Sequence, residues 1–498
     1  MTTQHLAARR QLESGQLRAA GARGLVVATG VLGSIATGWL VARGLWFLAA
    51  AVLLAVPMFV TLHRRPTVAL AIWLAITPLV TVTESGAIRR IFWLVHRALP
   101  VVVLIMLIVS VLIGLRERFT VRLGWPEVLA VGYLVATVLS LLYTGVDVGL
   151  SATHIYDRIF IPIVLYILVR LLEPDEGALR KLVPLVIFVL LLEILVGVLT
   201  WTSPGVLPDA WLNRAGERTS GTLRETNLYG VTVFTAGVFL LHAAMSDSWS
   251  AMQKRVLVWC TGAGFAMAAF TFSRAVWLAA AVTMIGLVSL YPRFVRRFVV
   301  VTAFVLLIAI PSGMLQSQID LAQNRFRSES SEESALSRLP VMAASVRMFE
   351  ARPAFGFGYE NFDRFDIIFQ RRVGNLYIPE KDHASHNVFL TILAEQGAVG
   401  IVLFLGPFGY WLAQSVRFRD RLPDHGLLGR QLVWILWLLV LAQVIVYNFS
   451  RLQVAFGFGL LWLMLGLVGS VLTLSIRKHE TLSVSGAESH ASARSHRS

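Results

Sequence analysis

Cysteine is almost absent from the sequence. Cys260 is the only one among 498 residues, and it lies within an apolar run. A single thiol excludes an intrachain disulfide and any metal site built from paired cysteines. Charged residues are also few: they make up 15% of the chain, against roughly 25% in soluble domains, while hydrophobic residues make up 56%. This balance excludes a water-soluble globular protein.

Acidic residues are fewer than basic ones. The chain has 29 Asp and Glu against 44 Lys and Arg, which gives a formal net charge of +15. In a soluble chain such an excess would suggest a nucleic-acid partner. In a membrane protein it has a simpler cause, because Lys and Arg accumulate in cytoplasmic loops. We therefore expect no nucleic-acid partner and interpret the excess as a signal of topology.

Long apolar runs, by contrast, are abundant between about residue 25 and residue 476. Most are long enough to cross a hydrocarbon core of about 30 Å as helices. The sequence predicts an all-α integral membrane protein, a polytopic bundle of about 12–14 transmembrane helices with one large extracytoplasmic loop that contains amphipathic helices. The predicted spans are 25–42, 45–62, 67–82, 98–115, 127–144, 159–172, 182–201, 227–245, 255–272, 275–291, 298–313, 386–416, 431–450 and 452–476.

The distribution of Lys and Arg predicts the orientation. With the N-terminus placed in the cytoplasm, the cytoplasmic segments carry 25 of them and the outer segments 19, of which nine lie in one long loop that the positive-inside rule governs poorly. Outside that loop the ratio is 25 to 10. We expect a multi-pass protein of the plasma (inner) membrane, surrounded by membrane lipids, with both termini cytoplasmic and the loop 314–385 periplasmic or extracellular.

Composition divides the chain into five segments. Residues 1–24 and 477–498 lack apolar periodicity and are predicted to be disordered cytoplasmic tails, the first of them basic. Residues 25–313 are predicted to form the N-terminal transmembrane helices with arginine-bearing outer loops. The large extracytoplasmic loop follows at 314–385, and the C-terminal transmembrane helices at 386–476.

The large loop contains one predicted helix. Within Arg338–Arg352, Leu339, Met342, Val346 and Phe349 recur at helical spacing, while polar residues occupy another face. This pattern predicts an amphipathic helix that lies on the membrane surface. The residues that follow, 353–358, are rich in turn formers.

Several arginines lie where the positive-inside rule disfavours them. An arginine fork suits phosphate oxygens, so a group of arginines facing one outer cavity would bind a diphosphate without a metal. The alternatives are contact with lipid headgroups or a local ion pair with Glu217 or Glu225. The arginines concerned are Arg214, Arg218 and Arg224 in the outer loop 202–226, Arg274 in a tight outer turn, and Arg338 at the start of the loop helix.

His386 is the second candidate, because it stands between a polar run and an apolar helix, at a membrane–water boundary. A helix N-terminus disfavours the imidazolium, so a neutral ring able to accept a proton from a hydroxyl is expected. The alternatives are an interfacial histidine that only serves the helix start, or a metal site with Asp382 and His383. Glu193, inside a predicted span, indicates either function or a polar partner.

Four stretches resemble one known family. His386-Asn387, followed after nine residues by Gly397-Ala-Val-Gly400, resembles the signature of the O-antigen ligase and O-antigen polymerase superfamily. Three further stretches look like the same family in the same order: ERTSGTLRETN (217–227), TFSRAVWLA (271–279) and SRLPVMAASVRMFEARPAFGFGYENF (337–362). One departure is Arg224-Glu-Thr-Asn227, where the family often has Asn-Pro-Asn.

The resemblance implies a membrane glycosyltransferase of polysaccharide biosynthesis in the cell envelope, such as that of lipopolysaccharide. It would move a glycan from undecaprenyl diphosphate to an acceptor hydroxyl on a lipid or another glycan, with no cofactor and no metal. The family's essential histidine falls on His386, and its phosphate-binding arginines fall on Arg218, Arg274 and Arg338. Secondary candidates at the same site are Arg214, Arg224, His383 and Asn387.

The residues themselves agree with this reaction, because the chain has no Asp-x-Asp, the usual metal–diphosphate handle of enzymes that use nucleotide sugars. Arginine must then supply the compensating charge. A flippase or exporter of lipid-linked saccharides is the alternative from a different class. It would also need many helices and a cationic cavity, but with charges deep in the spans. The motifs do not separate a ligase from a polymerase.

Overall fold

In the computed structural model, the chain is described over residues 61–80, 86–114, 123–143, 147–212, 219–309, 338–370, 385–450 and 455–495, apart from 247–248 and 425, with a few isolated positions elsewhere. Helices make up almost all of these residues, and no strand occurs among them. The predicted all-α polytopic membrane fold is confirmed. The N-terminal tail 1–24 lies outside the described residues.

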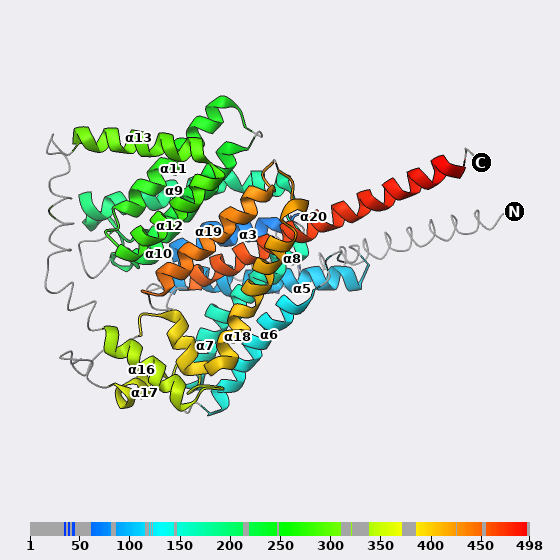
Figure 1. The fold of residues 1–498 in the computed structure, drawn as a ribbon. Coiled ribbons are helices and arrows are strands. Elements are labelled where there is room, and N and C mark those ends of the chain that lie inside the picture. Colours follow the sequence, from blue (N-terminus) through cyan, green and yellow to red (C-terminus); the bar gives the residue numbers. More distant parts are fainter. Residues whose placement is uncertain are drawn as a thin grey trace.

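The α-helices run in chain order and are labelled in Figure 1. They are α3 (Thr67–Val80), α4 (Gly86–Phe92), α5 (Leu99–Leu112), α6 (Trp125–Ser140), α7 (Val148–Ile155), α8 (Ile161–Leu172), α9 (Glu176–Thr202), α10 (Thr226–Met245), α11 (Ala251–Ala269), α12 (Arg274–Leu290), α13 (Pro292–Ala309), α16 (Arg338–Ala351), α17 (Phe362–Phe369), α18 (Val388–Arg417), α19 (Arg430–Tyr447) and α20 (Ala455–Ser495). Two π-helical turns, η1 (Trp93–Ala98) and η3 (Tyr156–Phe160), precede α5 and α8. Short 3-10 turns are η2 (Leu141–Tyr143), η4 (Pro204–Val206), η5 (Asp209–Trp211), η6 (Gly221–Leu223) and η7 (Arg419–Arg421).

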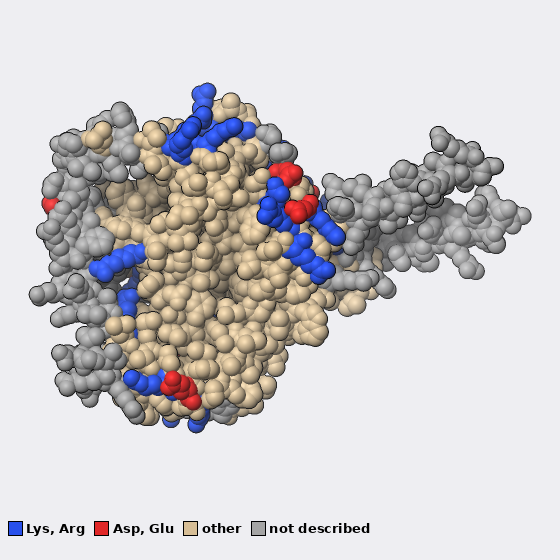
Figure 2. All heavy atoms as spheres, viewed as in Figure 1, with Lys and Arg blue, Asp and Glu red and all other residues tan. Residues whose placement is uncertain are grey.

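Twelve of the fourteen predicted spans coincide with helices, from α3 to α13 and from α18 to α20. The other two, 25–42 and 45–62, lie outside the described residues except at a few positions. Within the described part of the chain, six helices are long and apolar enough to cross a membrane, and three shorter ones are apolar. On the face shown in Figure 2, charged side chains gather toward the rims and leave a broad uncharged band between them.

Helices α10 and α20 form the centre of the bundle. In their most apolar windows 83% and 94% of the residues are buried, against 28% in α9 at the periphery. Helix α10 packs against α11, α19 and α9, and α20 packs against α8. These neighbours explain why the buried windows of both helices are mainly apolar on every side, as an enclosed helix must be.

Helix α20 departs from the predicted disordered tail. It continues to Ser495, through most of residues 477–498, and in Figure 1 its C-terminal part projects beyond the bundle. The sequence contains no proline from residue 424 onward, so no residue in the tail blocks the continuation of the helix. The sequence of this stretch is polar and has no apolar periodicity, although the chain is helical there.

The predicted loop helix is confirmed as α16, but its buried face was predicted wrongly. Helix α16 packs through Val341, Ala344 and Met348, whereas Leu339 and Val346, from the expected apolar stripe, are exposed. The reason is that α16 lies against α18 and α17 rather than alone on a flat membrane surface. In Figure 1, α16 and α17 lie together at one end of the bundle, called the loop end below.

The segment 353–358 is inserted into a break in α18. Gly397 interrupts the helix with φ 65° and ψ −161°, and the backbone groups around it bond to the inserted segment. The amides of Phe357, Gly358, Ala398 and Val399 donate to the carbonyls of Ala394, Glu395, Pro353 and Ala354 at 3.1, 2.6, 2.8 and 3.1 Å. Irregular backbone within a membrane helix requires such partners. A Cβ at Gly397 would lie 2.4 Å from the carbonyl oxygen of Ala354, so the approach requires glycine.

Candidate functional site: three helix starts and their arginines

Three helices begin next to one another at the loop end, and each has a polar N-cap. The Glu225 carboxylate accepts from the amide of Leu228 to cap α10. The Ser273 hydroxyl caps α12, and the Asn387 side-chain oxygen accepts from two amides at the start of α18 at 3.0 Å. Each cap satisfies amides that have no partner within the helix. The positive ends of the three helix dipoles therefore lie next to one another at the loop end.

The residue before each cap has a left-handed backbone. These residues are Arg224 (φ 59°), Phe272 (φ 49°) and His386 (φ 49°). Such angles are uncommon outside glycine, and strained residues of this kind cluster at functional sites. Two of the three, Arg224 and His386, are site residues predicted from the sequence. The strained backbone at each of them fixes the direction of the side chain at an energetic cost.

Hydrogen bonds join these helix starts to the residues that follow α19. Ser273 donates to the Asn227 side-chain oxygen, and the Asn227 amide donates to Ser450 at 2.9 Å. The Asn387 amide donates to the Asn448 side-chain oxygen at 3.0 Å. The C-terminal end of α19 is therefore the point at which α10, α12 and α18 meet, and it brings the turn that carries Arg274 to the same end as His386.

The electrostatics of this end favour an anion. Arg274 is the first residue of α12, and Arg338 is the first residue of α16. Burial lowers the pKa of the Arg338 guanidinium, and the nearby positive charge of Arg274 lowers it further. Two guanidinium groups that repel each other beside helix N-termini form a region of concentrated positive potential. Phosphate oxygens are the ligands that such an arrangement suits.

Glu193 holds the segment that leads into α10. Its carboxylate accepts from the amide of Thr222 at 3.0 Å and from the Thr222 hydroxyl at 2.5 Å. A Cβ at Gly221 would lie 2.2 Å from the Glu193 oxygen, so a glycine is required where the segment crosses α9. The structure thus gives this intramembrane acid a polar partner and a structural role in placing Arg224.

A second set of contacts fixes the other side of the inserted segment. Glu360, at φ 60°, pairs with His154 of α7 and with Arg158 of η3, the latter at 3.2 Å. Burial alone would raise the pKa of Glu360, but the hydrogen bond and charge of His154, together with Ser151 and Arg158, lower it. The carboxylate is therefore ionised at neutral pH, and it anchors the chain just after the inserted segment to α7 and η3.

Five of the predicted site residues lie in the described ranges, at or beside the starts of α10, α12, α16 and α18, and the charges of Arg274 and Arg338 are close enough to interact. These are Arg224, Arg274, Arg338, His386 and Asn387. Arg214, Arg218 and His383 lie outside the described residues, as does Asp382 of the alternative metal site. Within the described ranges, no three His, Cys, Asp or Glu residues are grouped so that they could hold a metal ion.

Sequence reasoning missed the residues that organise this end. In the sequence, Asn227 stands out only as part of a departure from a family pattern, and Asn448 and Ser450 only as the end of a predicted span. A usable signal was present: Asn227 and Asn387 follow or form helix caps, and Asn448 and Ser450 end an apolar run, so all four lie at helix boundaries. Their partners could not be paired without the fold.

Fold and site together define a class: a helical integral membrane protein with two arginines whose charges interact and a half-buried histidine at the starts of its helices. Residues 256–405 match the family model described as O-antigen ligase, which confirms the predicted resemblance to the O-antigen ligase and polymerase superfamily. The match includes Arg274, Arg338, His386 and Gly397, and it implies an enzyme of the ligase type. A search of curated proteins finds no match.

Proposed function

We propose that the protein transfers a glycan from undecaprenyl diphosphate to the hydroxyl of a lipid or glycan acceptor. The observation that supports the proposal is that Arg274 and Arg338, whose charges interact, and His386 stand at the starts of α12, α16 and α18. Arg274 and Arg338 supply the positive charge, and hydrogen bonds through Asn227 and Asn387 tie the starts of α12 and α18 to the end of α19. Glycan transfer from a lipid-linked diphosphate needs the arginines and the histidine to be within reach of the same substrate.

In the proposed mechanism, the acceptor hydroxyl loses its proton to His386, and its oxygen attacks the anomeric carbon of the glycan. The bond between that carbon and the diphosphate oxygen breaks, and the electron pair leaves with undecaprenyl diphosphate. Arg274 and Arg338, with Arg218 from outside the described residues, stabilise the charge that develops on the leaving group. A single general base contributes typically about 10²–10⁴ in rate.

The charge compensation is assigned to arginine, so the proposed reaction needs neither a metal ion nor a cofactor. Arg224, Arg214, His383 and Asn387 are proposed as secondary contacts, with Asn387 acting through the cap that places His386. The site is proposed to face away from the cytoplasm in the plasma membrane, with both termini cytoplasmic. This placement rests on the 25-to-10 distribution of Lys and Arg.

The test is reconstitution of the purified protein in vesicles with an undecaprenyl-diphosphate glycan and candidate acceptors, followed by mass analysis of the products. The expected result is an acceptor that gains the glycan, with turnover unchanged within a few-fold by EDTA. Loss of turnover that one divalent ion restores would contradict the arginine mechanism. Movement of the donor across the vesicle without transfer would replace the proposal with a flippase.

A further inference from the structure

The segment that follows α19 is held at two points by the candidate site. Asn448 accepts from the Asn387 amide at 3.0 Å, and Ser450 accepts from the Asn227 amide at 2.9 Å. Phe449 lies between these two residues in the chain, and its own amide donates to a carbonyl in the last turn of α19 at 2.9 Å. Hydrogen bonds therefore fix the backbone on both sides of Phe449.

The packing beneath this segment is close. Tyr447, the last residue of α19, is buried, and its ring stacks on that of Phe458 of α20 with the ring centroids 5.1 Å apart. A Cβ at Gly457 would lie 2.7 Å from the Tyr447 hydroxyl, so α20 approaches this point as closely as a glycine allows. A side chain carried by so firmly held a backbone is preorganised for a ligand.

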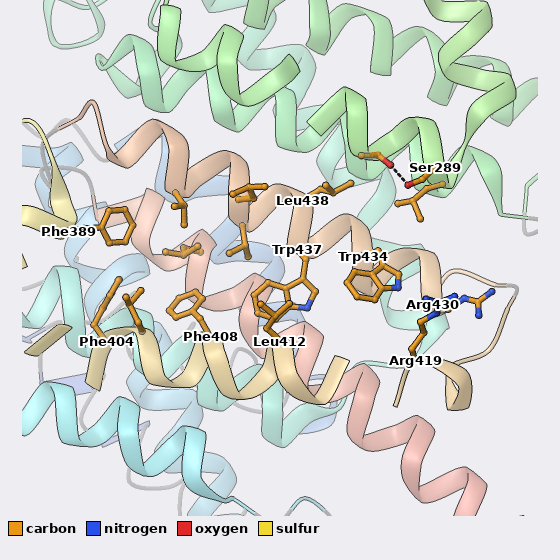
Figure 3. Close-up of a pocket in the computed structure, with 17 residues that line it drawn as sticks. Ser289, Phe389, Phe404, Phe408, Leu412, Arg419, Arg430, Trp434, Trp437 and Leu438 are labelled. Carbon is orange, nitrogen blue, oxygen red and sulfur yellow. Dashed lines mark hydrogen bonds between the residues drawn. The ribbon is translucent and has the colours of Figure 1, made fainter. Parts of the chain in front are cut away.

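Phe449 is 42% exposed, although its neighbours in the chain are buried or half-buried. The apolar groove bordered by α12, α18 and α19 does not account for this exposure. Figure 3 shows the side chains that line the groove, which on α19 extend from Arg430 to Val444, so Phe449 is not among them. The ring of Phe449 is thus an exposed apolar surface within a network of polar side chains.

The hydrogen bonds on either side of Phe449 lead to the two halves of the proposed reaction. The residue before it is bonded to the residue that directly follows His386. The residue after it is bonded to Asn227, which accepts from the residue that directly precedes Arg274. Cα atoms two positions apart are separated by at most about 7 Å, so both connections reach one short stretch of chain. Phe449 is the middle residue of that stretch.

The proposed reaction places a sugar at the same position. In the transition state, the acceptor oxygen and the diphosphate oxygen are both joined to one anomeric carbon. With the acceptor at His386 and the diphosphate at Arg274, the sugar that contains this carbon lies between the two residues, which is where the hydrogen bonds place Phe449. A sugar ring has an apolar face formed by its C–H groups, and this face packs well against a flat aromatic ring.

We propose that the ring of Phe449 packs against the sugar joined to the donor's diphosphate and thereby selects undecaprenyl diphosphate that carries a glycan over the bare lipid. The inference rests on the proposed function, since it concerns the donor of that reaction. The bare lipid is the product, so the contact is lost once the glycan has been transferred. The product is then bound more weakly than the donor, and a new donor displaces it.

The experiment measures equilibrium binding of two lipids to the full-length protein in vesicles, the undecaprenyl-diphosphate glycan of the transfer assay and bare undecaprenyl diphosphate. Phe449→Leu keeps an apolar side chain but loses the flat ring, so its affinity for the glycan lipid should fall about tenfold. Its affinity for the bare lipid should stay within about twofold. Phe449→Tyr keeps the ring and should bind both lipids within about twofold of the parent.

Phe188→Leu on α9 is the matched control, because Phe188 is 59% exposed at the periphery of the bundle, and it should bind both lipids as the parent does. Parent-like affinity of Phe449→Leu for the glycan lipid would overturn the inference, as would equal losses for the two lipids or an equal loss in Phe449→Tyr. A parent that binds both lipids but transfers no glycan would instead contradict the proposed function, so the two failures are distinguishable.

Discussion

At the scale of single residues, the candidate site depends on three backbone conformations that cost energy. Arg224, Phe272 and His386 have left-handed angles that cost a non-glycine residue roughly 1–2 kcal/mol each. The caps and hydrogen bonds that follow each residue hold it in place. Because His386 directly precedes the cap formed by Asn387, its ring position is set by the backbone and not by side-chain freedom alone.

The arginines give the first prediction. Arg274→Lys and Arg338→Lys keep the positive charge but lose the planar fork, so the affinity for the undecaprenyl-diphosphate donor should fall about tenfold in each. The measurement is equilibrium binding of the donor to purified protein. Arg296→Lys, on an exposed position of α13, is the control and should bind as the parent does. Parent-like affinity in both site variants would show that neither fork contacts the diphosphate.

At the scale of elements, the inserted segment 353–358 and the break in α18 stabilise each other. Gly397→Ala should therefore be strongly destabilising, because the added methyl would lie 2.4 Å from the Ala354 carbonyl oxygen at a backbone angle that disfavours alanine. We expect a lower unfolding temperature and slower glycan transfer. Gly409→Ala in the same helix is the control, since its Cβ would meet no atom within 4 Å. Equal unfolding temperatures for the two variants would rule out the required close approach.

The Glu360 anchor gives a prediction about pH. The pKa of Glu360 in the folded protein lies below its ordinary value of 4.5, so the unfolded chain binds the proton more readily. Its stabilisation is complete above that ordinary value and is lost as the pH falls through the folded value. Glu360→Gln should therefore lower the unfolding temperature at pH 7 and have a smaller effect below about pH 4. A difference independent of pH would show that the charge of Glu360 does not anchor the segment.

The elements also show what the sequence can predict. Span positions followed from apolar run length, and α16 and the turn-rich segment 353–358 were found where expected. The face through which α16 packs was not predictable, because Val341 and Met348 are no more apolar than Leu339 and Val346. Which of these two pairs of residues is buried depends on the position of α18, which the sequence does not give. The pairing of Asn227 with Ser450 likewise joins residues more than two hundred positions apart.

At the scale of the whole molecule, the orientation in the membrane is a further prediction. In a Cys260→Ser background, Glu350→Cys on the exposed side of α16 should react with an impermeant thiol reagent in intact cells, or in spheroplasts where an outer membrane blocks entry. Asp420→Cys, at the opposite rim, should react only after lysis. The reverse pattern would overturn the assignment from the positive-inside rule.

The most direct test of the central claim separates transfer from donor binding in His386→Ala. Removing the base but little phosphate-binding charge should lower the transfer rate by about 10²-fold or more and leave donor affinity within about threefold. His63→Ala is the histidine control, since His63 precedes α3 and pairs with Ser110 of α5, and it should keep the parent's rate. If purified His386→Ala transfers glycan at the parent's rate, His386 is not the base and the proposed mechanism is wrong.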